Sequence, residues 1–237
     1  YLTDKQLLDQ ALLAEGSMLK NKQITNSEGA TRSFSKNTYS TINSRGFNAK
    51  YSKTFHSISS IAIAGSDTNM QRDYEYSAAT HASDLLSAEE VGSLAAKRAA
   101  SRLNSKKIKS CTLDVIFEPR VAKSILSSFC SCASGTSIAR GTSFLNNQLN
   151  NLIFKKNINI TNNPKLKRGI GSAPYDSSGI KTENISIIQD GIFKNYFLNI
   201  RSARQLRMAI NGNSSPSNLI LDKGDQDIET IIKSIKN

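Results

Sequence analysis

The residues of this chain that could bind a metal ion are few and poorly spaced. Cys130 and Cys132 are separated by one residue, and the other candidates are Cys111, His56 and His81. Structural zinc sites usually pair two closely spaced couplets of Cys or His, and catalytic sites use motifs such as HExxH on a helix. A C-x-C pair on an apolar segment is more typical of small core packing. The sequence therefore predicts no metal site made by this chain alone.

Two other motifs approach known chemistry without completing it. The segment 135–139, GTSIA, resembles the G-x-S-x-G turn of serine hydrolases but ends in alanine and follows no strand. Both histidines lie in the first half of the chain, and nothing in the sequence places either near Ser137. The segment 167–171, KRGIG, lacks the preceding strand, the third glycine and the Lys-Ser/Thr pair of phosphate-binding loops. Hydrolysis by this chain alone is not expected.

A dense group of polar and aromatic side chains occupies the segment Met70–His81. On a strand, alternation would place Arg72, Tyr74 and Tyr76 on one face and Asp73 and Glu75 on the other. One interpretation is a wall of a peptide-binding cleft or a contact with a partner. The alternative is structural: two tyrosines in a half-buried strand with a solvated acidic edge.

The chain is strongly basic, with a formal net charge of +12 and a pI near 9.7. Such a charge is compatible with nucleic-acid binding, but the cations are scattered, and Tyr and Phe are not interleaved with them as a stacking platform requires. A compositional origin is therefore favoured, and nucleic acid is not an expected partner. The alternative function, a nucleic-acid- or gyrase-associated binding protein, requires an affinity for DNA that falls steeply with salt.

The remaining compositional features indicate a reducing compartment. Three cysteines do not suggest a disulfide framework, and no signal peptide or membrane-spanning segment is recognisable. We expect a cytoplasmic protein that does not associate with membranes. Tyr1 is not an initiator Met, and the chain ends on a polar helix, so a piece of a longer protein is expected.

Capping boxes and turn signals predict the elements of the first half. Thr3 with Gln6 and Ser87 with Glu90 begin helices that end near residues 20 and 104. Turn signals at 26–29 and 44–46 divide an antiparallel meander. The expected strands of the meander are Ile24–Ser33, Asn37–Asn43 and Phe47–Ala64. The polar segment Asn104–Lys107 separates two patterned regions and is the expected boundary between domains 1–107 and 108–237.

The second half is expected to be built around a helix that begins at Pro119 and carries an apolar stripe. Gly135 is expected to end this helix, and the small residues near it should let another backbone come close. The other expected elements are a strand at 113–117, a turn at 140–143, a strand pair or a strand with a loop at 149–160, a loop at 164–174, a hairpin at 185–199 turning at Asp190-Gly191, and helices at 201–208 and 225–236.

The order of these segments resembles the PmbA (TldE) side of the TldD/PmbA family. The similar stretches are TNSEGA at 25–30, the R-D-Y-x-Y-S segment at 72–77, the run from Phe117 to Leu145, the P-x₄-G-x-G-S-x-P-x-D-x₂-G loop at 164–179, and RSARQL at 201–206. Together they cover nearly the whole chain in collinear order. The resemblance implies an α+β fold with N-terminal helices on an antiparallel sheet and a strand-rich, barrel-like C-terminal part. It also implies that both ends are incomplete.

The same resemblance implies a function. The family is known for modulators of DNA gyrase and for a two-chain metalloprotease whose TldD partner carries HExxxH. Aligned on the shared R/K-G-T-S turn, that motif falls near 127–132, where this chain has no His or Glu. The resemblance thus implies a non-catalytic subunit, without a cofactor of its own, whose TldD-like partner carries the zinc. The subunit would bind unfolded peptides, and in isolation it could form a homodimer.

Three groups of residues are the expected cleft or partner contacts. They come from the polar–aromatic strand, from the turn after the Pro119 helix and from the glycine-rich loop. The candidates are Arg72, Asp73, Tyr74 and Tyr76; Arg140, Gly141, Thr142 and Ser143; and Gly169, Gly171 and Ser172.

Overall fold

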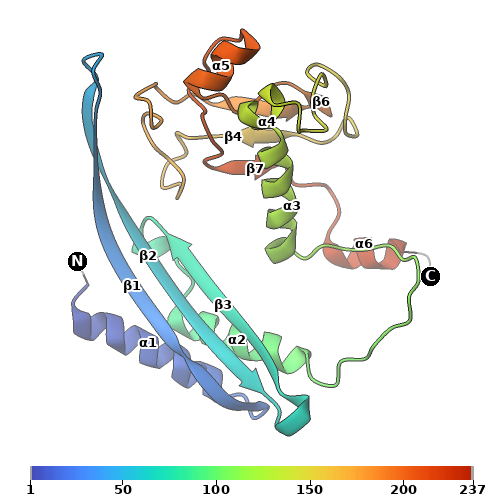
Figure 1. The fold of residues 1–237 in the computed structure, drawn as a ribbon. Helices are drawn as coiled ribbons and strands as arrows, with labels where there is room; N and C mark the ends of the chain where they lie inside the picture. Colours follow the sequence, from blue (N-terminus) through green and yellow to red (C-terminus); the bar gives the residue numbers. More distant parts are fainter. Residues whose placement is uncertain (1, 236–237) are drawn as a thin grey trace. The chain divides into compact units, whose positions relative to one another are not determined.

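The computed structural model describes residues 2–235, which form two compact units (Figure 1). The first contains Tyr1–Ser40 and Lys50–Lys109, and the second contains Thr41–Ala49 and Ser110–Asn237. Each unit is described by itself. Within residues 2–235, none of the helices has both the length and the apolar character that a membrane span requires.

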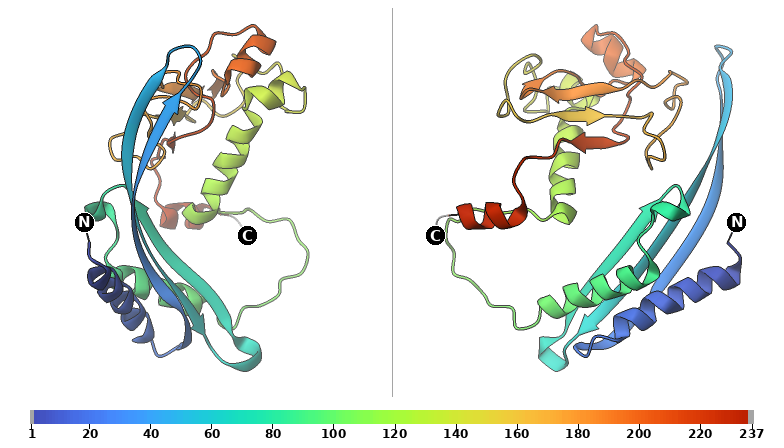
Figure 2. Two further views of the ribbon diagram at one scale, coloured as in Figure 1. Left: turned by 60° about the vertical axis from the view of Figure 1, so that its left-hand side comes forward. Right: turned by 180° about the vertical axis from the view of Figure 1, so that it is seen from behind.

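The first unit is a three-stranded antiparallel sheet covered on one face by two helices (Figure 2). Its strand order is β1-β2-β3, so β3 forms one edge. Short 3-10 turns at Asp67–Asn69 and Ala82–Asp84 flank β3. The main elements are α1 (Asp4–Leu19), β1 (Ile24–Ile42), β2 (Asn48–Ala64), β3 (Gln71–Ala79) and α2 (Ala88–Ser101).

Both helices of this unit begin where the sequence predicts. Thr3 Oγ1 accepts a hydrogen bond from the backbone N–H of Gln6 (3.3 Å), and the Gln6 side chain accepts one from the N–H of Thr3 (2.9 Å). Ser87 and Glu90 make the same reciprocal pair, at 3.2 and 2.9 Å. Each pair satisfies N–H groups that a helix start leaves without partners, so the capping-box prediction is confirmed.

Alternating burial along β2 shows which face of the sheet packs against the helices. His56, Ile58, Ser60, Ala62 and Ala64 are buried, whereas the residues between them are half-exposed. The buried residues meet small side chains of α1 and α2. The resulting core consists of Ala14, Met18, Ile24, Ile58, Ala62, Ala64, Ala88, Val91, Ala95, Ala96 and Ala99.

The predicted turn at 26–29 is wrong, because β1 continues through it. Gly29 has a φ of +98°, so the segment does use glycine in the left-handed region, but as an irregularity inside a strand. The Asn26 side chain accepts a hydrogen bond from the N–H of Ser27, and Ser27 Oγ accepts one from the N–H of Gly29. These hydrogen bonds satisfy the N–H groups of Ser27 and Gly29 at the irregularity, and β1 continues beyond it. The predicted turn at 44–46 is confirmed between β1 and β2.

The second unit packs a four-stranded sheet against α3. The strand order is β6-β5-β4-β7, and the sheet is open, so the α+β class is confirmed but a closed barrel is not formed. The elements are α3 (Pro119–Cys132), α4 (Gly135–Ala139), β4 (Ile160–Asn162), β5 (Ile185–Gln189), β6 (Ile192–Phe193), α5 (Ile200–Leu206), β7 (Leu219–Leu221) and α6 (Ile228–Ser234). Lys236, at the predicted end of the last helix, lies outside the described residues.

The core of this unit confirms the close backbone approach expected beside Gly135. The Gly135 N–H donates to the carbonyl of Phe197 (2.7 Å), and a Cβ at position 135 would overlap Leu198, Ser202 and that carbonyl. Gly135 nevertheless begins α4, whereas α3 ends at Cys132. The expected role of Gly135 as the helix stop is therefore wrong. The buried core comprises Cys130, Ala133, Ile138, Leu145, Ile160, Ile187, Ile188, Phe193, Tyr196, Phe197, Leu198 and Ala203.

Two other predictions for this unit fail, and one holds. The segment 113–117 is extended but unpaired with any described strand, and Leu113, Val115 and Phe117 are more than half exposed. Residues 149–159 are turns and irregular backbone with one isolated bridge between Leu152 and Ile192, and only Ile160 of the predicted range belongs to a strand. The Asp190-Gly191 turn is confirmed: both residues have positive φ (49° and 76°), and Gln189 pairs with Ile192 across it.

Candidate functional site

The helix-free face of the first unit carries the exposed side chains of β3. Arg72 is half-exposed, and Tyr74 and Tyr76 are 41% and 44% exposed. Their rings are stacked with centroids 6.2 Å apart, and Arg72 Nε donates to Glu28 of β1 at 2.8 Å. Since β3 is an edge strand, its free edge could pair with an extended peptide beside these rings.

The acidic residues of β3 face inward, contrary to the expectation of a solvated acidic edge. Asp73 and Glu75 are only 6% and 7% exposed. Glu75 Oε2 lies 2.9 Å from Arg98 Nη2, and Asp73 Oδ2 lies 3.3 Å from Arg102 Nη1. Arg98 lies in the last turn of α2 and Arg102 is its C-cap residue. Being four residues apart, they lie on the face that meets the sheet. These ion pairs hold β3 against α2, and Asp73 is a supporting residue with no access to the helix-free face.

The second predicted group, Arg140–Ser143, forms the turn after α4. Gly141 has a φ of +69°, and a Cβ there would meet no neighbouring atom, so only the backbone conformation requires glycine. Ser143 is buried and donates from Oγ to the carbonyl of Cys132 (2.7 Å). Thr142 Oγ1 donates to the carbonyl of Ser137 (3.2 Å). Ser143 and Thr142 therefore brace the turn through their side chains. Arg140 is the C-cap residue of α4, and its N–H donates to the carbonyl of Thr136 (3.2 Å).

The third group lies in the loop 164–174, which Asn218 holds in place. The N–H of Gly171 donates to Asn218 Oδ1 (2.8 Å), and Asn218 Nδ2 donates to Ser172 Oγ (2.8 Å). A Cβ at Gly169 would meet the Asn218 side chain, and one at Gly171 would overlap the backbone of Ser217. These glycines are required by close packing within the loop. The residues of this group contact the segment 217–218, whereas the Arg140–Ser143 group contacts α3 and α4. The described contacts of the two groups are therefore with different parts of the second unit.

A buried amide network behind this loop was not anticipated from the sequence. Asn162 is fully buried, and its Nδ2 donates to Asn213 Oδ1 (2.7 Å). Its Oδ1 accepts from the N–H of Ser217 (2.8 Å), and Asn213 Nδ2 donates to the carbonyl of Glu183. The abundance of asparagine in the chain hides these few positions, because the sequence does not distinguish a buried amide from a surface one.

The segment of α3 where the resemblance expects the zinc motif, residues 127–132, is a poor place for a metal. Cys130 is fully buried in the core, and burial raises the pKa of its thiol to about 12, so the thiolate that binds zinc is strongly disfavoured. Ser131 Oγ donates to the carbonyl of Ser127. Across residues 2–235, no three His, Cys, Asp or Glu side chains gather closely enough to hold an ion. The residues present here therefore do not fit a catalytic zinc.

The two histidines converge, but on the helix-covered side of the first unit and without a carboxylate. His56 and His81 line a cavity of about 410 Å³ together with Phe34 and Thr54. Phe34 lies against the His56 ring, with centroids 4.7 Å apart. His56 Nδ1 lies 3.4 Å from Arg32 Nη2, and His81 Nδ1 lies 2.7 Å from Ser83 Oγ. The guanidinium of Arg32 therefore suits a neutral His56 that accepts at Nδ1.

Protonation of His56 is expected to destabilise the first unit. Burial lowers the pKa of His56 below its usual 6.5, and the charges of Arg32 and His81 lower it further. The unfolded chain then binds more protons than the folded one as pH falls below 6.5, so the stability difference between wild type and His56→Gln should shrink between pH 7.5 and 5. Urea unfolding at both pH values measures it. If the stability difference between wild type and His56→Gln is the same at both pH values, and NMR shows that His56 titrates near 6.5, the lowered pKa of His56 is contradicted.

Domain models of one protein family match almost the whole chain. Residues 2–103 match the domain described as the PmbA/TldA metallopeptidase central domain, and residues 110–237 match the PmbA/TldA metallopeptidase C-terminal domain. The "Metalloprotease PmbA homolog" of Buchnera aphidicola subsp. Acyrthosiphon pisum is 37% identical over 87% of this chain and 46% of its own length. The "Metalloprotease PmbA" of Escherichia coli O157:H7 is 34% identical over 88% of this chain and 47% of its own length. The chain thus spans about half the length of these curated relatives.

Solved structures share the same fold at lower identity. A Bacteroides thetaiotaomicron protein proposed to modulate DNA gyrase matches with a TM-score of 0.89 and 24% identity, over 99% of this chain and 54% of its own. TldE from Thermococcus kodakarensis matches with a TM-score of 0.77 and 16% identity, over 99% and 56%. These similarities show the fold.

Proposed function

The chain belongs to the PmbA/TldD family of metallopeptidases, and from that premise we propose that it is the non-catalytic half of a two-chain zinc protease. In this proposal a TldD-like partner supplies the zinc ion and the glutamate that activates water. The present chain supplies part of the surface that binds an unfolded peptide.

The observation that carries the proposal is the chemistry of α3. A catalytic zinc needs about three protein ligands and an open position for water. Residues 127–132 offer serine, phenylalanine and cysteine, and the buried Cys130 resists ionisation because its pKa is raised to about 12. A member of this family whose α3 lacks zinc ligands can contribute to proteolysis only when it is paired with a chain that has those ligands.

The helix-free face of the first unit supports a role in peptide binding. Hydrogen bonds from an edge strand to an added strand engage main-chain groups, which every peptide has, so they bind unfolded chains with little sequence preference. Tyr74 and Tyr76 flank the free edge of β3 and can cover the side chains of an added strand. The Glu75–Arg98 and Asp73–Arg102 pairs hold this strand from behind.

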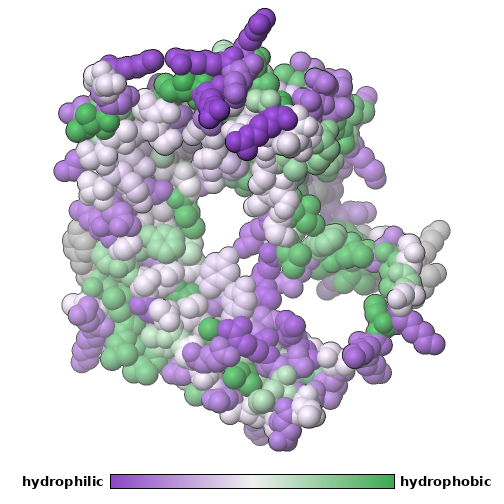
Figure 3. Space-filling model, viewed as in Figure 1, coloured by the Kyte–Doolittle hydropathy of each residue, from purple (hydrophilic) through white to green (hydrophobic). Residues whose placement is uncertain are grey.

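Exposed apolar surface supports the expectation of a partner. Figure 3 shows apolar surface gathered over α1 and over α3 and α6. On α1, Leu8 and Leu12 are more than half exposed, and on α3, Val121 and Ile125 are nearly half exposed. Apolar patches of this kind are usually covered by another polypeptide. They fit a chain that functions within a larger assembly.

Reconstitution of the pair tests the proposal. The full-length protein and the TldD-like protein of the same organism are purified separately and together, and hydrolysis of an unfolded test peptide is followed with and without a chelator. We expect chelator-sensitive hydrolysis by the pair and none by the full-length protein alone. Hydrolysis by the full-length protein alone would refute the division of roles. So would a TldD-like partner whose rate of peptide hydrolysis is the same alone and in the pair.

A further inference from the structure

The first unit contains a buried guanidinium group with no carboxylate partner. Arg32 of β1 is only 8% exposed, on the helix-covered face of the sheet. Its Nε donates to Gln10 Oε1 (2.7 Å), and its Nη1 donates to the carbonyls of Ser33 (2.5 Å) and Ser57 (3.2 Å). All of these acceptors are neutral, and within residues 2–235 no carboxylate oxygen lies within 4 Å of the group.

An uncompensated buried charge is unfavourable, and burial accordingly lowers the pKa of Arg32. Two acidic side chains, Glu89 and Glu90, line the cavity next to Arg32, and neither is ion-paired with it among the described contacts. Glu90 lines the same cavity, but its carboxylate accepts the N–H of Ser87 in the capping box, which lowers the pKa of Glu90. Glu89 also lines the cavity, where it is exposed to solvent at the start of α2. The charge of Arg32 is therefore available to an anion from outside the described chain.

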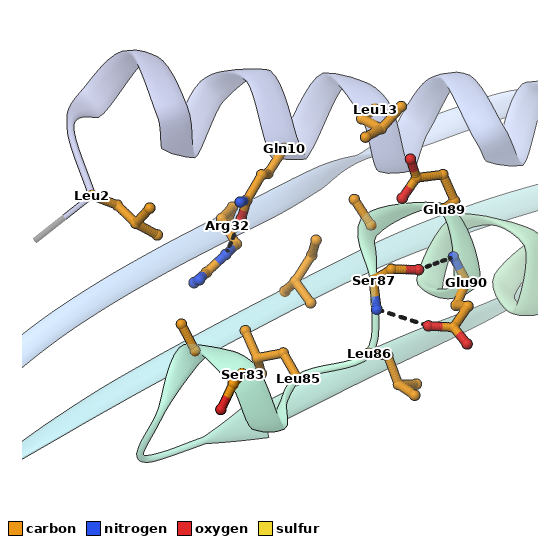
Figure 4. Close-up of a pocket in the computed structure, with 13 residues that line it drawn as sticks. Leu2, Gln10, Leu13, Arg32, Ser83, Leu85, Leu86, Ser87, Glu89 and Glu90 are labelled. Carbon is orange, nitrogen blue, oxygen red and sulfur yellow. Dashed lines mark hydrogen bonds between the residues drawn. The ribbon is translucent and has the colours of Figure 1, made fainter.

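The guanidinium faces a cavity large enough for a small ligand. The cavity has a volume of about 470 Å³ and lies between α1, the sheet and residues 82–90. Figure 4 shows Arg32 pointing into this space, with Gln10 above it and Leu2, Leu85 and Leu86 around it. The rest of the lining is mixed, with aliphatic and polar residues in equal number: Leu13, Ile58, Ala82 and Ala88 beside Ser83, Ser87, Glu89 and Glu90. Pockets of a few hundred cubic ångströms that combine an apolar lining with polar groups are typical ligand sites.

The same region offers further hydrogen-bond donors. Arg32 Nη2 carries two protons, and its one described contact is His56 Nδ1 at 3.4 Å. When neutral His56 accepts at Nδ1, it carries its own proton on Nε2, and His56 lines the neighbouring cavity. The two cavities share Leu2 and Ala82 as lining residues. A carboxylate at this junction could accept from both side chains while an aliphatic group occupied the larger cavity.

We propose that this site binds a carboxylate attached to an aliphatic body, such as the C-terminus of a peptide that ends in leucine. It lies on the helix-covered face of the sheet, whereas the proposed peptide-binding strand edge presents Tyr74 and Tyr76 on the opposite face. The site is therefore separate from the proposed function and does not depend on it. A charge-assisted bond to a guanidinium would supply the specificity for the acid.

Binding of matched acids and amides to the 237-residue chain tests the site. The probes are N-acetyl-Ala-Ala-Leu, its C-terminal amide, and octanoate, titrated by calorimetry. We expect the peptide acid to bind at least tenfold more tightly than the amide. Equal binding of octanoate would identify a site for free aliphatic acids, and weaker binding of octanoate would identify one for peptide C-termini. Equal affinity for acid and amide, or no saturable binding of either acid, would overturn the proposal.

Substitution of the guanidinium provides the matched comparison. Arg32→Gln should weaken acid binding at least tenfold and remove the preference over the amide, whereas Arg45→Gln, in the exposed β1–β2 turn, should leave both unchanged. Arg32→Gln also removes the hydrogen bonds to the carbonyls of Ser33 and Ser57, so thermal melting checks its fold before binding is compared. The acid–amide comparison on the unaltered chain decides the question even if the variant unfolds. An Arg32→Gln variant that is folded and still prefers the acid would also overturn the site.

Discussion

Gly92→Ala is expected to destabilise the first unit by about 2–3 kcal/mol, even though alanine is the better helix former. Gly92 lies in the middle of α2, where the backbone of α1 comes closest. A Cβ at this position would overlap the carbonyl oxygen of Ala14 and crowd the N–H of Met18, and both are backbone groups that cannot rotate away. The two helices would have to separate, which would open the core around Val91, Ala95 and Met18.

Gly16→Ala is the matched control. Gly16 lies in α1, is exposed, and would place its Cβ in open space, so the same substitution should stabilise the helix by about 0.5–1 kcal/mol. Urea unfolding and hydrogen exchange of the α1 and α2 amides compare the two variants. Equal effects of the two substitutions, or an unchanged midpoint for Gly92→Ala, would show that the helix contact is looser than described.

The double variant Tyr74→Ala/Tyr76→Ala is expected to lower kcat/KM of the reconstituted protease about tenfold. Each aromatic contact with a bound strand is worth about 0.5–1.5 kcal/mol, and 1.4 kcal/mol corresponds to tenfold. Since these rings would bind the peptide without touching the reacting atoms, the loss should appear mainly as a higher KM. The expectation rests on the proposed function, and steady-state kinetics of the full-length pair measures it.

Tyr39→Ala/Tyr51→Ala serves as the control for this double variant. These rings are also stacked, with centroids 5.0 Å apart, but they lie beyond the part of β2 that pairs with β3. A peptide added to the edge of β3 would not reach them, so kcat/KM should stay near the wild-type value. If this control loses as much activity as Tyr74→Ala/Tyr76→Ala while both variants remain folded, the peptide does not bind at the β3 edge.

Local signals in the sequence predicted several elements correctly because their causes are local. The Thr3–Gln6 and Ser87–Glu90 boxes satisfy donors within one helical turn, and Asp190-Gly191 supplies the two positive φ angles of a tight hairpin. Pro119 likewise begins α3 for a local reason, because its missing N–H would have no partner in the first turn of a helix. Such features depend on residues a few positions apart, so one sequence suffices to predict them.

Features that depend on distant segments were mispredicted or missed. Alternation correctly separated Asp73 and Glu75 from Tyr74 and Tyr76. Which face packs inward depends on distant cations, Arg98 of α2 and the C-cap residue Arg102. Acidic residues ordinarily prefer solvent, so the prediction placed them there.

The buried Arg32 was missed for a similar reason. An arginine ordinarily prefers solvent, and its burial here depends on Gln10 of α1 and on the carbonyl of Ser57 in β2. The amides of Asn162 and Asn213 meet across 51 residues of sequence, which no local pattern reveals.

The metal content of the purified protein tests the central claim most directly. The full-length protein and the reconstituted pair are each incubated with zinc, desalted and measured by mass spectrometry of the metal, with a test-peptide assay on the same samples. We predict about one zinc ion per active pair, retained by the TldD-like chain, and substoichiometric zinc without cleavage for the present protein alone. One tightly bound zinc ion per molecule of the isolated protein, together with chelator-sensitive cleavage, would contradict the account.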